Sequence, residues 1–218
     1  MPAIKNNKDQ PLKTEQHFPI IGVGASAGGL DAFKKLIRAI PEESGMAYVL
    51  VQHLDPQHES MLPQILERET KIPVHEIRDN IPLAPNHIYI IPENKILTST
   101  DGVLKLTVRD LKIKNLPIDI FFTSLAEVHG NYAVGVVLTG TASDGTEGLK
   151  AIKANGGITI AQDPQSATYA AMPQSAINAG VVDFILTPEK IASQLAEIIK
   201  SYNNNSPHTD GELLSRDD

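Results

Sequence analysis

The sequence predicts an α/β fold: a doubly wound, mostly parallel sheet with helices on both faces and an added antiparallel hairpin, a Rossmann-like three-layer sandwich. Short apolar runs alternate with helical patterns at both ends of the chain, which is typical of parallel strands joined by crossover helices. A loop of small residues joins the first apolar run to its helix. The middle third is a series of short strand candidates separated by turn signals, which predicts antiparallel edge strands.

Two strands and two helices are predicted in the N-terminal part of the domain. Apolar, largely β-branched runs indicate buried strands at 18–23 and 47–52. A helix with one apolar face is expected over 30–40. Ser60 can cap a further helix over 61–70.

The middle third predicts only short strands. Candidates lie at 72–77 and 88–91, with turn signals between them. The runs 96–100 and 103–108 flank Asp101-Gly102, a dipeptide that favours a tight hairpin turn. We expect this region to lie to the side of the parallel core.

The last third returns to alternating strands and helices. The expected elements are a helix over 117–129, a strand over 133–138, a helix ending near 155–157, a strand over 158–161, a helix closed by Gly180, a strand over 182–186 and a helix from Pro188. Residues 18–201 are therefore expected to form one domain. Polar composition predicts flexible segments at 1–17 and 202–218.

Composition limits the possible functions. The chain has 218 residues, of which 41% are hydrophobic, enough for a substantial core. Its net charge of -7 argues against nucleic-acid binding, and without cysteine it can form no disulfide, thiolate nucleophile or zinc–thiolate site. No apolar run is long enough to span a bilayer, and no signal segment opens the chain, so a cytoplasmic protein without membrane insertion is expected.

Ser26 is the one hydroxyl in the loop of small residues after the first strand. Its neighbours are Gly22, Gly24, Ala25, Ala27, Gly28 and Gly29, so backbone amides can crowd around it. Three interpretations are open. The loop could cradle a phosphate at the helix N-terminus, it could present Ser26 as a nucleophile beside oxyanion-binding amides, or Ser26 could cap the helix.

Polar residues that follow the predicted parallel strands should meet at one edge of the sheet. They are Ser26, Gln52-His53 with Asp55, the loop Thr139 to Asp144, and Gln162-Asp163. A hydroxyl, an imidazole and carboxylates thus converge there. A serine needs a base to take its proton, and a carboxylate can orient that base, so the set is compatible with nucleophilic catalysis. Taken alone, Asp144 could instead cap the following helix.

Two other chemistries fit parts of this edge. His53, Asp55 and His58 could suggest metal ligands, although Pro56 and the absence of a helical pair of ligands weaken that interpretation. Gly22, Gly24 and Ala27 satisfy the G-x-G-x-x-[GA] pattern of a dinucleotide site. Against this, the second strand runs into Gln52-His53 rather than ending on an acid.

A set of ordered motifs resembles the catalytic domain of bacterial chemotaxis protein-glutamate methylesterases, the CheB family. The motifs are GVGASAGGLDAF, YVLVQHLDP, IPVHEIRDN, LAPNHIYIIP, FFTSLAE, GVVLTGTASDGTEGLKAIKANGG and TIAQDPQSATYAAMP. The resemblance extends from Phe18 to about Leu195. The form QHLDPQHES is similar to the version in which this domain is fused to a receptor methyltransferase domain.

The resemblance implies a serine esterase that hydrolyses glutamyl methyl esters on the cytoplasmic domains of chemoreceptors, releasing methanol, with deamidation of receptor glutamines as a second activity. It implies a Ser26–His53–Asp144 triad and no metal or cofactor. The choice of Asp144 over Asp163 or Asp55 comes from the resemblance. A non-catalytic sensor or scaffold module and, further off, a dinucleotide-binding protein are the alternatives.

The chain departs from the family pattern at two site positions. Ala27 follows the nucleophile where free-standing enzymes commonly have threonine, and Thr141 stands where they have methionine. The amides of Ala27, Gly28 and Thr141 are the expected oxyanion and substrate contacts. The usual N-terminal receiver domain does not precede Phe18 in this sequence, so regulation is expected from a fused or separate methyltransferase or receiver domain.

Overall fold

Seven parallel strands form the central sheet of the protein, whose computed structural model describes residues 18–52, 61–100, 103–110 and 116–205. In spatial order they are β10 (Phe184–Leu186), β9 (Ile158–Gln162), β8 (Ala133–Val137), β1 (Ile20–Ala25), β2 (Ala47–Gln52), β5 (His87–Ile90) and β3 (Val74–Glu76). From β1 the chain passes to β2, then to β3 at the edge, returns to place β5 between β2 and β3, and later crosses over to place β8 on the other side of β1. The strand order therefore reverses at β1.

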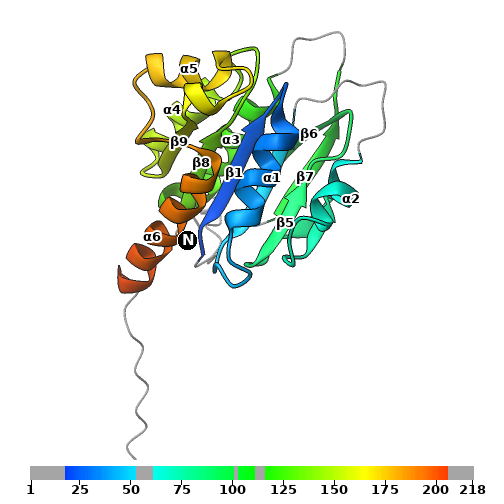
Figure 1. Cartoon of the computed structure of the whole chain (residues 1–218). Helices are drawn as coiled ribbons and strands as arrows, with labels where there is room; N and C mark the ends of the chain where they lie inside the picture. The colour runs from blue at the N-terminus through cyan, green and yellow to red at the C-terminus, as the bar shows by residue number, and fades with distance from the viewer. Residues whose placement is uncertain (1–17, 53–60, 101–102, 111–115, 206–218) are drawn as a thin grey trace, which may run out of the picture.

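Helices cover both faces of this sheet (Figure 1). The apolar side chains of α1 (Gly29–Ala39) and α6 (Pro188–Asn205) pack on one face, with α2 (Leu62–Glu67) beside them. On the other face lie α3 (Pro117–His129), α4 (Thr146–Ala154) and α5 (Ala171–Asn178). Successive residues of β1 point to opposite faces of the sheet: Ile21 packs in the core with α1 and α6, and Ile20 packs in the core with α3, α4 and α5. The doubly wound, three-layer prediction is confirmed.

A second, smaller sheet is antiparallel and has the order β4-β7-β6. Its strands are β4 (Ile81–Pro82), β7 (Val103–Val108) and β6 (Lys95–Thr100). The predicted hairpin is confirmed in its strands, while its turn at 101–102 lies outside the described residues. The Oγ of Ser99 lies 2.8 Å from Nε2 of His129, so β6 is tied to the end of α3 through two buried side chains.

The expectation that the whole middle third adds antiparallel edge strands is wrong for two of its strands. β5 and β3 pair in parallel and extend the central sheet. The reason is burial: Ile88, Tyr89 and Ile90 are all at most 2% exposed, so β5 is covered on both faces, as inner parallel strands are.

Element ends differ from the predictions in several places. α2 ends at Glu67, short of the predicted residue 70, and Ser60, its predicted cap, lies outside the described residues. Short 3₁₀ helices form at η1 (Gly130–Tyr132) and η2 (Pro164–Ser166). α6 continues to Asn205, where the ring of Tyr202 stacks on Tyr132 with centroids 5.1 Å apart. Residues 202–205 of the predicted tail are thus helical, and the division into domain and tails otherwise stays a prediction.

Candidate active site

Ser26 lies at the point where the strand order reverses. It directly follows β1, and its backbone N–H donates to the carbonyl of Thr139, 3.0 Å away, in the loop that follows β8. One step earlier, the N–H of Leu138 donates to the carbonyl of Gly24 at 2.8 Å. The two loops are therefore joined by backbone bonds at the sheet edge where α/β proteins bind their ligands.

The Ser26 side chain is half-buried, and among the described residues no group forms a hydrogen bond with its hydroxyl. The interpretation of Ser26 as a helix cap is wrong: Gly28 is the N-cap of α1 and no side chain caps this helix. Gly28 adopts φ 77°, a left-handed conformation that favours glycine, and the N–H of Gly29 donates to the Ser26 carbonyl at 2.9 Å. The tight turn leaves the hydroxyl available at the end of the strand.

The amides of Ala27, Gly28 and Thr141 stay a prediction as oxyanion donors. Within the described part of the chain, the N–H groups of Ala27, Gly28 and Thr141 donate to no acceptor. Ala27 and Gly28 are half-buried next to Ser26, whereas Thr141 is exposed in the loop after β8. Such amides are the donors that an oxyanion requires.

Thr139 and Gln162 hold the two loops in place, a role that sequence reasoning did not assign to them. The Thr139 hydroxyl accepts from the N–H of Tyr169 at 2.8 Å and lies 3.1 Å from the Ala27 carbonyl. Oε1 of the buried Gln162 accepts from the N–H of Thr139 at 2.9 Å, and its Nε2 donates to Ser166. The signal in the sequence was only their position after two parallel strands.

Asp144 is buried beneath the same edge, with 2% of its surface exposed. Its Oδ1 accepts from the N–H of Asp119 at 2.9 Å and its Oδ2 from the N–H of Ile118 at 3.1 Å. Asp144 therefore caps α3, whereas the simple expectation from sequence was a cap on the following helix α4, whose N-cap is Gly145. Burial raises the pKa of Asp144 to about 6, although the two amides favour the carboxylate.

The predicted base, His53, lies outside the described residues, as do Asp55 and His58. The described chain reaches this segment through Gln52, which pairs with Ala25 in the register of β2 and β1. Asp163, another carboxylate considered for the orienting role, accepts from the N–H of Gln165 in its own turn at 3.0 Å. Among the described residues no cluster of three or more acidic or histidine side chains could hold a metal ion.

The glycines of the dinucleotide pattern do not form a phosphate-binding turn. Gly22 and Gly24 lie inside β1, where a Cβ on Gly24 would come within 2.5 Å of Cγ2 of Ile118. Because these glycines have no side chain, α3 can pack closely against β1. The pattern in this chain therefore serves helix packing.

Asp119 is a further buried polar residue that the sequence did not single out. It lies in the first turn of α3 and is 8% exposed. Its Oδ1 accepts from the N–H of Gly145 at 2.9 Å and from the N–H of Gly148 at 2.7 Å. In sequence, an acid in a first helical turn suggests only a favourable interaction with its own helix dipole.

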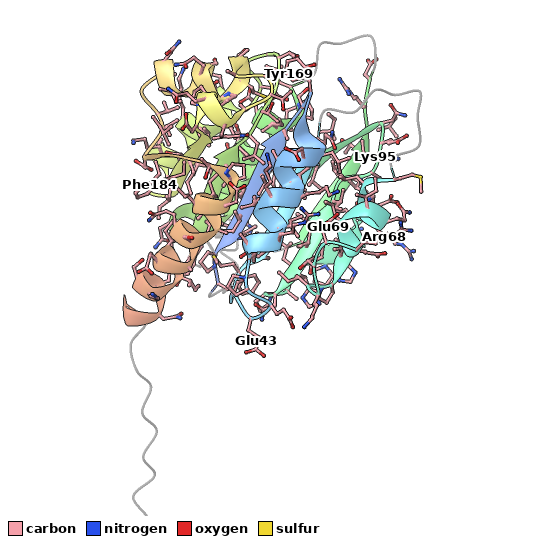
Figure 2. The ribbon with its side chains drawn as sticks, in the orientation of Figure 1. Glu43, Arg68, Glu69, Lys95, Tyr169 and Phe184 are labelled. Carbon is pink, nitrogen blue, oxygen red and sulfur yellow. The ribbon has the colours of Figure 1, made fainter. Side chains whose placement is uncertain are left out.

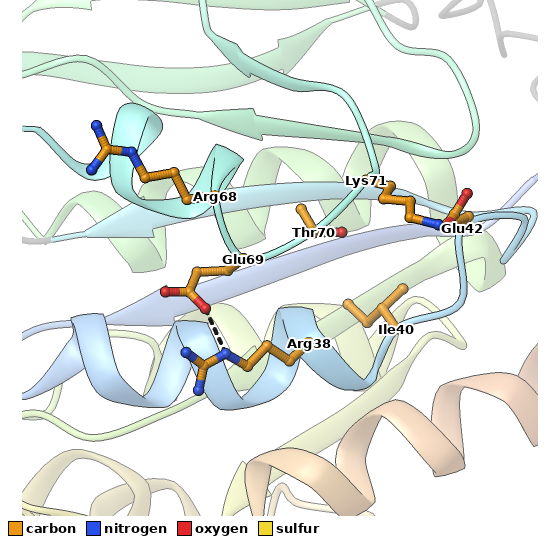
Figure 3. A pocket seen from close by; sticks show the side chains of 7 residues that line it. All are labelled: Arg38, Ile40, Glu42, Arg68, Glu69, Thr70 and Lys71. Atoms are coloured by element: carbon orange, nitrogen blue, oxygen red, sulfur yellow. Dashed lines mark hydrogen bonds and ion pairs between the residues drawn. The ribbon is translucent and has the colours of Figure 1, made fainter.

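Tyr169 and a polar surface hollow lie at different places on the molecule. Tyr169, 47% exposed, lies at the edge where β1 ends (Figure 2). The hollow, about 340 Å³, lies where α1 and α2 end (Figure 3). It is lined by Arg38, Ile40, Glu42, Arg68, Glu69, Thr70 and Lys71. Its acids are paired, Glu69 with Arg38 at 2.5 Å and Glu42 with Lys71 at 3.1 Å, and none of the residues that line it belongs to the candidate site.

Comparisons with known proteins agree on one family. The model of the CheB methylesterase family matches residues 21–195. The crystal structure of the CheB methylesterase catalytic domain of Thermotoga maritima superposes with a TM-score of 0.76 at 28% identity, covering 83% of this chain and 98% of that one.

No helix in the described part of the chain is both long and apolar enough to cross a bilayer.

Two of three similar sequences are named as methylesterases, and the third is uncharacterized. A putative protein-glutamate methylesterase/protein-glutamine glutaminase of Leptospira interrogans is 35% identical over 178 residues, 81% of this chain and 92% of that protein. Protein-glutamate methylesterase/protein-glutamine glutaminase 3 of Pseudomonas aeruginosa is 38% identical, over 82% of this chain and 54% of that protein. An uncharacterized 104.1 kDa protein of Rhodobacter capsulatus is 43% identical over 138 residues, 63% of this chain but only 14% of its own length.

Proposed function

The chain belongs to the CheB methylesterase family, and from this premise we propose that it hydrolyses the methyl esters of glutamate side chains on chemoreceptor cytoplasmic domains, releasing methanol. The observation that carries the proposal is the setting of Ser26. Its hydroxyl stands at the end of the central strand, beside amides that have no acceptor among the described residues. The buried carboxylate of Asp144 lies in the adjoining loop.

In the proposed reaction, Ser26 Oγ attacks the ester carbonyl while the imidazole of His53 takes the hydroxyl proton. The tetrahedral oxyanion is held by the amides of Ala27, Gly28 and Thr141. Methanol leaves with the proton from His53, which leaves an acyl ester on Ser26. Water, activated by His53, then releases the glutamate and restores the serine. Asp144 keeps the imidazole in the required tautomer and stabilises its charged form.

The same steps accommodate a glutamine side chain, with ammonia leaving instead of methanol. Two of the similar proteins carry both activities in their names, methylesterase and glutaminase. An amide is a weaker electrophile than an ester, so deamidation should be the slower reaction. Both substrates place a side-chain carbonyl at the same distance from the backbone of the receptor, so one site serves both.

The partner that we propose is a helical receptor segment in the cytoplasm. Leu30 and Tyr169 are 37% and 47% exposed, and both belong to segments that adjoin the Ser26 loop. Large exposed apolar side chains beside a polar site suit the apolar stripe of a helix. The match to the uncharacterized 104.1 kDa protein covers only 14% of that protein, so the similar segment lies within a much longer chain. Regulation by a fused or separate methyltransferase or receiver domain is part of the proposal.

The experiment is methanol release from a methylated receptor cytoplasmic fragment by the wild-type chain and by Ser26→Ala, His53→Ala and Asp144→Asn at equal folded concentration. We expect release by the wild type and its loss in Ser26→Ala and His53→Ala. Binding of the fragment without any release would favour a non-catalytic scaffold. Release by Ser26→Ala at the wild-type rate would refute a serine mechanism.

A further inference from the structure

Two buried carboxylates hold α3 and α4 together by capping each other's segment. Asp144, just before α4, accepts from the amides of Ile118 and Asp119 in the first turn of α3. Asp119, on α3, accepts from the amides of Gly145 and Gly148 at the start of α4. The first-turn amides of a helix have no acceptor within that helix. Each carboxylate therefore accepts from such amides at the start of the other helix. The turn that carries Asp144 is fixed from both sides.

Burial makes these four bonds important for the position of the turn. Asp144 and Asp119 are 2% and 8% exposed, and a buried carboxylate that loses its donors is strongly unfavourable. Burial raises the pKa of both carboxyls, and the Asp119 charge raises the pKa of Asp144 further. The amides that each carboxylate accepts from act in the opposite direction. The amides at two helix N-termini supply the compensating positive potential.

Two glycines allow Asp119 to reach the start of α4. A Cβ on Gly148 would lie 2.5 Å from the Cβ of Phe122 and 3.2 Å from the Cα of Asp119, so the two helices touch through bare backbone here. Gly145 adopts φ 99°, and a Cβ on it would lie 2.8 Å from Cγ2 of Val137. Both amides thus donate to one oxygen of Asp119, and a larger residue at either position would push α3 and α4 apart.

We infer that Asp119 is a positioning residue for the esterase: its carboxylate fixes the turn between β8 and α4, and so holds Asp144 where it must orient the base. The inference rests on the proposed function of Ser26, His53 and Asp144. Asp119 touches no substrate atom. It acts through the amides of Gly145, the residue after Asp144, and of Gly148, in the first turn of α4.

The geometry separates the hydrogen-bonding role of Asp119 from its charge. A single oxygen, Oδ1, accepts both amides, so Asp119→Asn can keep the bonds while the charge is lost. Asp119→Ala loses both. Because the Asp119 charge raises the pKa of Asp144, Asp119→Asn should also move the acidic limb of the activity profile to lower pH.

The test compares kcat and KM for methanol release by the wild type, Asp119→Ala and Asp119→Asn. We expect Asp119→Ala to lower kcat by roughly tenfold or more with KM little changed, since a displaced turn misorients the base. Asp119→Asn should recover most of kcat. If Asp119→Ala does not fold, Asp119→Glu replaces it, because its extra methylene displaces the same amides and should lower kcat similarly.

The matched control is Asp183→Ala. The Asp183 carboxylate also accepts a backbone amide, that of Thr159 at 2.9 Å, but Thr159 lies at the start of β9, the opposite edge of the sheet from Ser26. Asp183→Ala should lower stability and leave kcat of the folded protein unchanged. Wild-type kcat in Asp119→Ala or Asp119→Glu, or an equal fall in Asp183→Ala, would overturn the inference.

A second readout keeps this test apart from failure of the proposed function. Ser26→Ala shows whether the methanol release is the proposed reaction. Should the wild type release no methanol, amide hydrogen exchange at Ile118 and Gly145 still decides whether Asp119 fixes the turn. Loss of protection at both amides in Asp119→Ala, with Asn restoring it, supports the inference, and unchanged protection refutes it.

Discussion

The N–H of Ser26 donates to the carbonyl of Thr139 at 3.0 Å, and this bond joins the loop after the central strand β1 to the loop after β8. Thr139 then anchors a third segment through its hydroxyl, which accepts from the N–H of Tyr169 at 2.8 Å. Three chain segments that are distant in sequence thus meet behind the proposed nucleophile. Several expected outcomes depend on this junction and on the packing beneath it.

Removing the Thr139 hydroxyl should loosen the Ser26 loop. Thr139→Val keeps the shape of the side chain but leaves the Tyr169 amide without an acceptor, so we expect a loss of about 1–2 kcal/mol in the free energy of unfolding. We also expect kcat for methanol release to fall by roughly tenfold. Thr139→Ser keeps the hydroxyl and serves as control; equal effects of the two changes would show that the hydroxyl does not matter.

Gly24 should be intolerant of a side chain because α3 approaches β1 there. A Cβ would lie 2.5 Å from Cγ2 of Ile118, so Gly24→Ala should lower the free energy of unfolding by about 1–3 kcal/mol. Ile118→Ala removes the obstructing atoms. In a double-mutant cycle measured by urea unfolding, the combined loss should be smaller than the sum of the single losses. Strict additivity would mean that the two residues do not clash.

The stability of the fold should decrease at acidic pH through His129. Burial lowers its pKa from 6.5 to about 4, so folding favours the neutral imidazole. This contribution is complete above pH 6.5 and is lost as the pH falls toward 4, by an amount on the order of 3 kcal/mol. The raised pKa values of Asp119 and Asp144 act in the opposite direction.

Comparison with a variant isolates the histidine. The difference in unfolding free energy between the wild type and His129→Gln should shrink or change sign as the pH is lowered from 7.5 to 4.5. Both proteins retain the two buried aspartates, which therefore cancel. A constant difference across this range would contradict a buried neutral His129.

Esterase activity should fall on acidification. The imidazole of His53 must be neutral to accept the Ser26 proton, and a free imidazole has a pKa of roughly 6.5. Asp144 must be ionised to stabilise the charged imidazole, and its pKa is about 6, so both groups lose their required form as the pH decreases. We expect kcat/KM to fall below about pH 6–7. A flat profile between pH 5 and 8, with chemistry limiting, would contradict this assignment.

Tyr169 should contribute to substrate binding through its exposed ring. Tyr169→Ala is expected to raise KM for a methylated receptor fragment severalfold while kcat changes little, because the ring is exposed at the edge where β1 ends and has no part in the proposed chemistry. Ile185→Ala is the control, since Ile185 is 50% exposed on the edge strand β10. Equal KM values for wild type and Tyr169→Ala would place the receptor elsewhere.

Much of the architecture was predictable because burial leaves a periodic trace in the sequence. The continuous apolar runs of β1, β2 and β8 and the striped helices α1 and α6 indicated a parallel sheet, and Ser26 stood out as the hydroxyl after its first strand. The pairing of β5 and β3 was not predictable, since short strands carry little information about their partners. Their place in the central sheet depends on which faces the helices cover.

The hydrogen bonds that hold the site in place could not be predicted from the sequence. Asp119 binds amides that lie 26 and 29 residues away, and that contact exists only because glycines bring α3 and α4 together. Gln162 similarly reaches Thr139 across 23 residues. Such bonds follow from tertiary packing, and local patterns of helix and strand carry no record of them.

The central claim is that Ser26 attacks the receptor ester, and an acid-quenched, single-turnover reaction measured by intact-protein mass spectrometry tests it most directly. With a methylated receptor peptide, we predict a transient adduct equal to the peptide mass minus methanol, located on the fragment that contains Ser26 and absent from Ser26→Ala. Release of methanol at equal rates by the wild type and Ser26→Ala, with no adduct on either protein, would contradict the account.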